Sequence, residues 1–418
     1  MNWRQRLQPI FTGFAPNLRG KELKLIGQYL FFPWKWSQWQ NGAGETRLNQ
    51  VLASYFNATS ALSVDSGRSA LYLALQALRV TKGDEVIIPG FTCVVVPNAV
   101  RWTGAVPIYV DINPDFNLNV DLLINKITVR TKAIIIQHTF GRSVDMERIL
   151  ALAKERGIAI IEDCAHALGA RYQGRLLGTF GDYAIFSFGT DKIISCGRGG
   201  ALISNRKNDE EKIRELKNNL PSFPRSQIFP ILLHFPIFYF SKPLYHFFLG
   251  KLFLFLTKKL HLTMRIITDG EKRGERPKFI PCRLANCLAE IVLSQFSDLE
   301  KINQHRANIA RYYDLHLSNS HLEKPEWDGE SIWLRYPVLT NQPAQIHQYC
   351  RQKGIILGDW YNQPVAPKDI SLEAAQYQLN SCPQAETLAK QVINLPTDLA
   401  ITPIIAQRIV NTLNTYGD

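Results

Sequence analysis

The stretch IIEDCAHALGARYQGRLLGTFGDYAIFSFGTDKIISCGRGGALIS, residues 160–204, decides the fold. It contains three short apolar runs, which end at residues 161, 188 and 204 and are separated by glycines and polar residues. Runs of this length and composition are typical of buried strands. Asp163 follows the first run and Lys192 follows the second. Because ligands bind at the carboxyl ends of parallel strands, both side chains are expected at a ligand-binding edge of a sheet.

The sequence before this stretch alternates in the same way. Apolar runs at 84–89, 106–112 and 132–138 predict strands, and 146–156 has the periodicity of an amphipathic helix. This alternation predicts an α/β fold in which helices flank a mostly parallel sheet. We expect a large domain at 45–283 and a smaller α+β domain at 284–418 that begins with one long helix. Residues 1–44 are expected to form an irregular arm packed on the body.

Composition and charge narrow the class of protein. The 418 residues are 46% hydrophobic, a composition that excludes disordered and collagen-like chains. The net charge of +12 favours an anionic partner. The seven cysteines show no paired spacing, so neither a disulfide framework nor a zinc site is expected. No secretory signal and no spanning run of about 18 apolar residues are present. The predicted location is the cytoplasm.

A second segment offers a place for a phosphate. Ser66, Gly67 and Arg68 join a predicted strand to a predicted helix, and the backbone N–H groups at a helix start bind anions. An ordinary helix cap with a glycine turn explains the same residues. The segment is not a Walker A loop, since no GK[ST] follows it, and it is not a GxGxxG dinucleotide fingerprint.

A phosphate cradle, a carboxylate at a sheet edge and a lysine on a later turn are the three parts that pyridoxal phosphate requires. The cradle anchors the phosphate, the carboxylate keeps the ring nitrogen protonated, and the lysine forms the Schiff base. Taken singly, Asp163 also fits a helix cap, and Lys192 also fits a surface charge.

Together these motifs resemble the DegT/StrS-type sugar aminotransferases, which are fold type I pyridoxal phosphate enzymes. The segments that carry the resemblance are SGRSALYLAL, GDEVIIPGFT, QHTFG, EDCAHALGA, FSFGTDK, GRGGALIS and NLPT. The resemblance implies that Lys192 is the Schiff-base lysine and proton shuttle and that Asp163 pairs with the ring nitrogen. It places His166 beside the ring, and Ser187, Gly67 and Arg68 at the phosphate.

Three residues depart from the family pattern. Cys93 stands where an aromatic side chain usually stacks on the ring, so either Phe91 or another ring replaces it or the cofactor is held less firmly. Pro281 stands where the neighbouring subunit usually supplies an Asn, although the Arg of that motif is retained as Arg283. Arg198 stands where the family often has Glu.

The resemblance implies transamination of a keto sugar, expected to be nucleotide-linked, with an amino acid such as glutamate as donor. It further implies a homodimer, with Arg283 serving the neighbouring subunit's substrate, and a role in amino-sugar or surface-polysaccharide biosynthesis. Two alternatives stay open. The family's sugar dehydratases carry His in place of the lysine, so Lys192 argues against that activity. The other alternative is a sensory or scaffold protein that keeps the fold but catalyses no reaction. The departures at Cys93 and Pro281 favour this alternative. No metal and no nucleic acid are expected.

The segment 216–268 is longer than the resemblance requires. It has no Asp or Glu, seven Lys and Arg residues, and two apolar clusters interrupted by Pro, His and Lys. Such a segment fits an element docked on the inner face of an anionic membrane. It fits equally a lid or dimer contact whose apolar residues are covered by protein.

Overall fold

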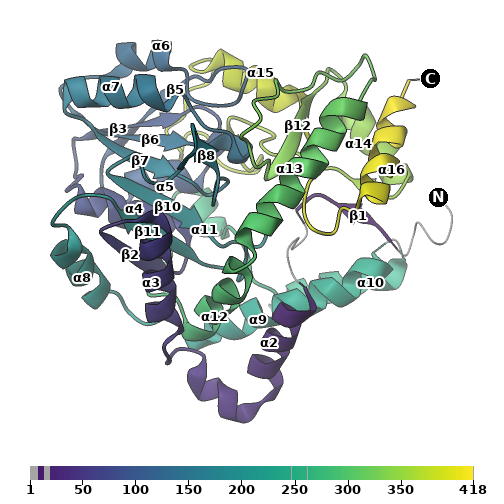
Figure 1. Cartoon of the computed structure of the whole chain (residues 1–418), viewed down its shortest axis with the longest axis horizontal. Coiled ribbons are helices and arrows are strands. Elements are labelled where there is room, and N and C mark those ends of the chain that lie inside the picture. Colours follow the sequence, from purple (N-terminus) through teal and green to yellow (C-terminus); the bar gives the residue numbers. More distant parts are fainter. Residues whose placement is uncertain (1–7, 14–18, 246, 261, 418) are drawn as a thin grey trace.

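The computed structural model describes residues 8–13, 19–245, 247–260 and 262–417 (Figure 1). Its centre is a seven-stranded sheet with the order β2-β11-β10-β7-β6-β3-β5. The strands of this sheet are β2 (Ser60–Val64), β3 (Glu85–Pro89), β5 (Val106–Val110), β6 (Thr131–Gln137), β7 (Ala159–Asp163), β10 (Tyr183–Ser187) and β11 (Gly200–Ser204).

The sheet is parallel except at one edge, where β11 runs antiparallel to both β10 and β2. The pairing of β7 with β10 sets Asp163 opposite Ile185, two residues before the end of β10 at Ser187. This register brings the segments after β7 and β10 to the same edge of the sheet. The predicted α/β architecture is thereby confirmed.

The sheet separates two hydrophobic cores, because successive side chains of a strand point to opposite faces. In β10, Ala184 and Phe186 pack into one core, while Tyr183 and Ile185 pack into the other. Helices cover both faces: α3 (Gly44–Phe56), α7 (Met146–Arg156), α9 (Arg225–Ser241) and α12 (Asn286–Phe296) contribute to the first core, and α4 (Gly67–Ala77), α5 (Val95–Arg101) and α15 (Pro383–Gln391) to the second.

A smaller lobe lies beside the sheet with a core of its own (Figure 1). It is built on an antiparallel strand pair, on which the long helix α13 and three shorter elements pack. Its elements are α13 (Leu299–His316), β12 (Arg335–Leu339), α14 (Pro343–Gln352), β13 (Ile355–Ile356), β15 (Val392–Pro396) and α16 (Pro403–Asn414). The short strand β14 (Val365–Ala366) pairs with β4 (Thr92–Cys93) of the large lobe.

Two expectations about the helices were wrong. The described part of 1–44 is not irregular, since it contains helix α2 (Gly20–Phe31) and the 3₁₀ helix η1 (Pro33–Gln38), and α2 packs on α9 and α12. The long helix expected from 284 is broken between α12 and α13. Asp298 lies at the break and pairs with Lys21 and Arg19, so the break is where the N-terminal segment is held.

The segment 216–268 contains two helices that differ in burial. In α9 the residues Ile228, Ile231, Leu232 and Phe235 belong to the main core. A 3₁₀ turn, η4 (Lys242–Leu244), leads to α10 (Phe248–Lys259), which packs on α9 but leaves most of its described side chains exposed. The helices that the structure describes include none long and apolar enough to cross a membrane.

Candidate active site

The predicted phosphate cradle forms where β2 passes into α4. Ser66 caps the helix, and its Oγ accepts a hydrogen bond from the Ser69 N–H and donates one to Asp65. The first N–H groups of a helix have no partner within it, so those of Gly67 and Arg68 suit an anion. A Cβ atom on Gly67 would lie 3.2 Å from the Cβ of Ser187, and one on Gly200 would lie 2.4 Å from the Gly67 nitrogen. Glycine at both positions therefore allows β10, β11 and the helix start to meet closely.

Asp163 ends β7 and is buried, as expected for a side chain at the carboxyl edge of the sheet. Its Oδ1 accepts a hydrogen bond from the Ala165 N–H at 3.0 Å, so it also caps the following turn. Burial raises the pKa of Asp163, while Lys192 and His138 oppose that rise. A protonated ring nitrogen beside Asp163 would stabilise its ionised form.

Lys192 lies on the loop between β10 and β11, with its Nζ 4.7 Å from the ring centroid of Trp360. Burial lowers the pKa of Lys192, although the neighbouring Asp191 acts in the opposite direction. A lowered pKa increases the fraction of neutral amine, which is the nucleophilic form that reacts with a carbonyl group. The surroundings of Lys192 therefore favour its neutral amine.

His166 is buried among aromatic rings. Its imidazole stacks on Trp360 at 5.6 Å and on Phe140 at 6.2 Å between centroids, and Nδ1 accepts a hydrogen bond from the Phe140 N–H. Burial places the pKa of His166 well below its ordinary value, and Lys192 and Arg335 add to the effect. The ring is therefore neutral, which lets it lie beside other rings without introducing a buried charge.

One cavity of about 340 Å³ collects the predicted residues. This volume lies within the range of small-molecule sites. All seven residues predicted at the cofactor line it, namely Ser66, Gly67, Arg68, Asp163, His166, Ser187 and Lys192. Arg283 does not line it; its Nη2 donates a hydrogen bond to Ser222 at 3.2 Å.

Two aromatic residues of the cavity were missed by the sequence analysis. Trp360 and Tyr361 line it from the loop between β13 and β14, whereas Cys93 lines it without a ring. Phe91 does not take the place of the missing ring, because it is fully buried beneath the site against Phe116 and Tyr361. Adjacent aromatic residues in the otherwise polar segment GDWYNQP were the available signal.

A buried ion pair fixes this aromatic loop against the lysine loop. Arg335 of β12 donates to the Asp191 carboxylate at 3.0 Å, and its guanidinium lies 3.6 Å from the ring centroid of Trp360. Both members are almost fully buried. Arg335 of the smaller lobe thus holds Trp360 beside Lys192. Sequence spacing could not identify this role of Arg335.

The phosphate end of the cavity carries two arginines. Arg198 is 8% exposed, its Nη2 lies 3.2 Å from the Asp65 carboxylate, and its buried Nε has no hydrogen-bond partner among the described residues. Arg68 pairs with the buried carboxylate of Glu271 and donates to the Ile266 carbonyl at 2.8 Å. An unused N–H donor beside a helix start fits a bound phosphate group.

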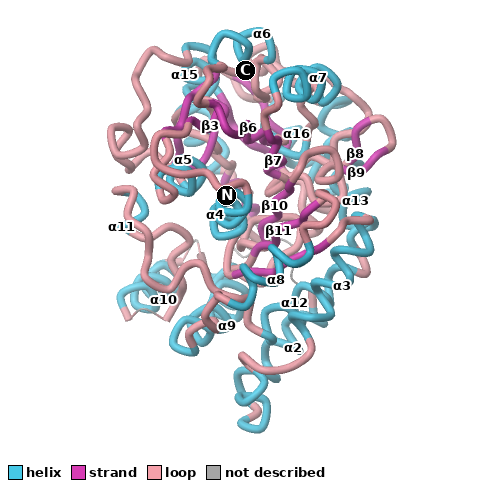
Figure 2. The backbone as a smooth tube through the Cα atoms, turned by 90° about the vertical axis from the view of Figure 1, so that its left-hand side faces the viewer, coloured by secondary structure: helices cyan, strands magenta, loops and turns pink. Residues whose placement is uncertain are grey.

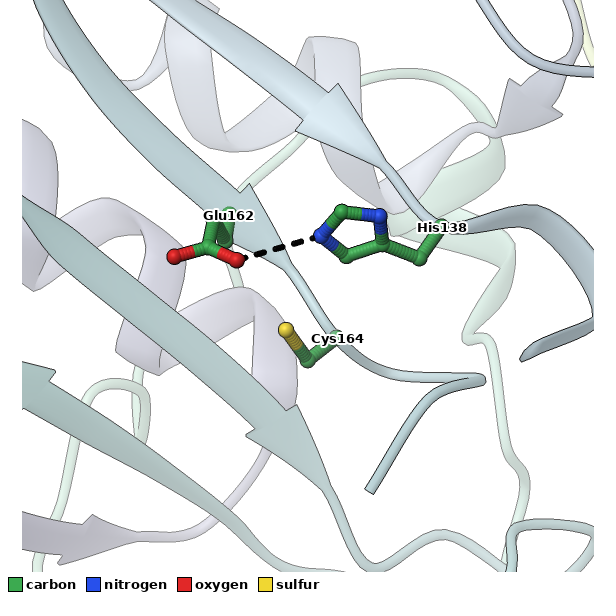
Figure 3. A group of neighbouring side chains, drawn as sticks. All are labelled: His138, Glu162 and Cys164. Atoms are coloured by element: carbon green, nitrogen blue, oxygen red, sulfur yellow. Dashed lines mark hydrogen bonds and ion pairs between the residues drawn. The ribbon is translucent and has the colours of Figure 1, made fainter. Parts of the chain in front are cut away.

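A buried trio on the other face of the sheet has the composition of a metal site, but the donor atoms of two of its members, His138 and Glu162, already make hydrogen bonds within the protein. His138, Glu162 and Cys164 lie together without exposure to solvent (Figure 3). Glu162 accepts hydrogen bonds from the N–H groups of Gly178, Phe180 and Gly181, each at 2.7 Å. The Nδ1 of His138 accepts from a backbone N–H, which leaves Nε2–H to donate to Glu162. The trio stabilises the sheet edge.

Comparisons with known proteins identify relatives of this chain. Residues 33–222 and 278–414 match the model of the DegT/DnrJ/EryC1/StrS aminotransferase family, and the unmatched gap contains α9 and α10. The chain is 40% identical over 195 residues, 46% of its length, to a GDP-perosamine synthase of Escherichia coli O157:H7, and spans 53% of that relative. It is 30% identical over 388 residues, 91% of its length, to a dTDP-3-amino-3,6-dideoxy-alpha-D-galactopyranose transaminase of Aneurinibacillus thermoaerophilus, and spans 92% of it.

A solved structure supports the same assignment. The structure of S. venezuelae DesV in complex with a ketimine intermediate superposes with a TM-score of 0.72 at 26% sequence identity. The superposition covers 95% of this chain and 94% of that one. The similarity therefore extends over both lobes.

Proposed function

The chain belongs to the DegT/DnrJ/EryC1/StrS aminotransferase family, and from this premise we propose that it transfers an amino group from an amino acid such as glutamate to a keto sugar. The observation that carries the proposal is the single cavity shared by Lys192, Asp163 and the phosphate cradle at Ser66–Arg68. The sugar relatives named above support a nucleotide-linked acceptor and a role in amino-sugar biosynthesis. A role in surface-polysaccharide biosynthesis belongs to the proposal as an implication of the resemblance.

The cavity fits pyridoxal phosphate as cofactor. The backbone N–H groups of Gly67 and Arg68, the Ser187 hydroxyl and the unused Nε of Arg198 would hold its phosphate. Asp163 would hold the ring nitrogen, and His166 and Trp360 supply flat surfaces for the ring. When bound, this cofactor supplies a carbonyl group that exchanges amino groups and a ring that accepts electrons.

The residues of the chain then have distinct tasks. The Lys192 amine would hold the cofactor through a covalent link and would carry the proton that leaves the donor Cα. The Asp163 carboxylate would balance the positive charge of a protonated ring nitrogen. The overall exchange would convert glutamate to 2-oxoglutarate and the keto sugar to an amino sugar. The aromatic loop at Trp360 and Tyr361 limits the access of water to Lys192.

The proposal includes a second copy of the chain. Arg283 of one copy would serve the substrate of another, as the family resemblance implies. Arg283 does not line the cavity of its own chain, and its buried Nε has no hydrogen-bond partner among the described residues, which supports a role outside that cavity. The domain division at 283/284 belongs to the same proposal.

The test is a screen of donors and acceptors. The protein reconstituted with pyridoxal phosphate is incubated with glutamate and a panel of nucleotide-linked keto sugars, and products are identified by mass spectrometry. We expect an amino sugar with one of these acceptors and none with the Lys192→Ala variant. A cofactor-loaded protein that yields no oxo acid from any donor would instead support the scaffold alternative.

A further inference from the structure

Helix α10 presents an apolar face to solvent. Leu249, Leu252, Phe253, Leu256 and the capping residue Leu260 are 38% to 70% exposed. They are spaced three and four residues apart, so they form one continuous row on the helix surface, here called the apolar strip. Figure 2 shows α10 at the margin of the molecule, next to α9 and below α11.

A different side of α10 packs on the protein. Gly250 and Thr257 are buried and lie seven residues apart, which places them on a common face. A Cβ atom on Gly250 would lie 2.1 Å from the Leu244 carbonyl oxygen, so the contact with the preceding turn requires glycine there. The helix is therefore attached through its small residues, and its large apolar side chains point away from the core.

Positive charge lies on the other exposed faces of α10. Lys251, Lys258 and Lys259 are exposed on α10, and no Asp or Glu occurs between 216 and 268. At the end of α9, Tyr239 and Phe240 are also exposed. In a symmetric contact between two copies, two lysine-rich helices would meet without any acidic residue of 216–268 to pair with them. An anionic lipid surface accommodates the apolar strip and the lysines together.

We propose that α10 docks the protein peripherally on an anionic phospholipid bilayer. The apolar strip enters the boundary between headgroups and acyl chains, and the three lysines contact the headgroups. The helix has 12 residues and is about 18 Å long, against about 30 Å for the hydrocarbon core, so it lies in the plane of the interface.

Docking also affects the cavity. Met264, Arg265 and Ile266 follow α10 closely in the chain and line the cavity that holds Lys192. A bilayer-bound α10 therefore brings the rim of the cavity close to the lipid headgroups. This consequence rests on the proposed function, whereas docking itself does not.

Vesicle co-sedimentation of the full-length, cofactor-loaded protein tests the proposal. We expect binding to vesicles of phosphatidylcholine with phosphatidylglycerol and none to phosphatidylcholine alone, with binding weakened by added salt. The K251E/K258E/K259E variant should lose affinity on the order of 100-fold, from about 1 kcal/mol for each lysine. The K82E/K126E/K154E variant alters three exposed lysines elsewhere and should bind like the parent.

A second variant separates lipid insertion from simple charge attraction. L252Q/F253Q/L256Q keeps every lysine, and it should reduce vesicle binding at least tenfold while retaining the parent's cofactor absorbance. No vesicle binding by the folded parent would overturn the proposal. So would a parent dimer, measured by light scattering, that becomes monomeric in L252Q/F253Q/L256Q, because the strip would then be covered by a second copy. Neither vesicle binding nor light scattering depends on transaminase activity. A negative result for membrane docking would therefore not contradict the proposed function.

Discussion

The cavity around Lys192 and the segment 216–268 differ in how their sequences encode their roles. In the cavity, seven residues from three separate segments of the large lobe were expected at one site, and the structure gathers all of them. In 216–268, two apolar helices of similar composition have opposite environments, since α9 is part of the main core and α10 is exposed. The residue types of a cofactor site can be predicted because the chemistry of the cofactor requires them. Apolar composition alone does not predict whether a helix is buried in the protein or exposed.

The largest expected effect sharpens the cavity side of this comparison. Lys192→Ala should abolish transamination, because both the covalent link to the cofactor and the proton carrier are lost. Borohydride reduction followed by peptide mapping should place the cofactor on Lys192 in the parent protein. Lys207→Ala removes an exposed lysine outside the cavity and serves as the matched control, with activity retained. A cofactor found on another lysine would refute the assignment.

Asp163→Asn should lower the rate by several orders of magnitude while the cofactor stays bound. The amide keeps the shape of the carboxyl but cannot balance a protonated ring nitrogen, so the ring accepts electrons less readily. Single-turnover rates at saturating glutamate, measured beside the cofactor absorbance, check this. A rate close to that of the parent would show that another group keeps the ring protonated.

The contrast between the two helices can be tested by stability. Phe235 of α9 is fully buried, so Phe235→Ala should lower the free energy of unfolding by about 3–5 kcal/mol. Phe253 of α10 is 46% exposed, so Phe253→Ala should change it by no more than about 0.5 kcal/mol. Denaturant unfolding of both variants gives the comparison. An equal loss in the two would mean that α10 is covered by protein in solution.

The smallest expected effect concerns the arginine that departs from the family pattern. Arg198→Gln should weaken pyridoxal phosphate binding by about tenfold, the scale of one charge-assisted hydrogen bond. Pyridoxal, which lacks the phosphate, should bind the variant and the parent alike. Arg206→Gln, at an exposed ion pair with Asp182, is the control with unchanged affinity for both compounds. An equal loss for pyridoxal and pyridoxal phosphate would assign Arg198 a structural role only.

The sheet and the cavity could be predicted from the sequence because local sequence patterns indicate both. Apolar runs marked the strands, and Asp163 and Lys192 stood out because each follows a strand at its carboxyl end. Trp360 and Arg335 were not predicted at the site, because they belong to the smaller lobe and only the three-dimensional packing places them beside Lys192. The break at Asp298 also depended on distant partners, Lys21 and Arg19, which no local pattern in 284–317 reveals.

The central claim is that this cavity transfers amino groups, and the first half of the reaction tests it without knowledge of the sugar. The protein loaded with pyridoxal phosphate is mixed with glutamate in the absence of an acceptor, and 2-oxoglutarate is quantified. The account predicts about one equivalent of 2-oxoglutarate per subunit from the parent and none from Lys192→Ala. Absence of any oxo acid from the loaded parent, with glutamate and with every other amino acid donor, would contradict it.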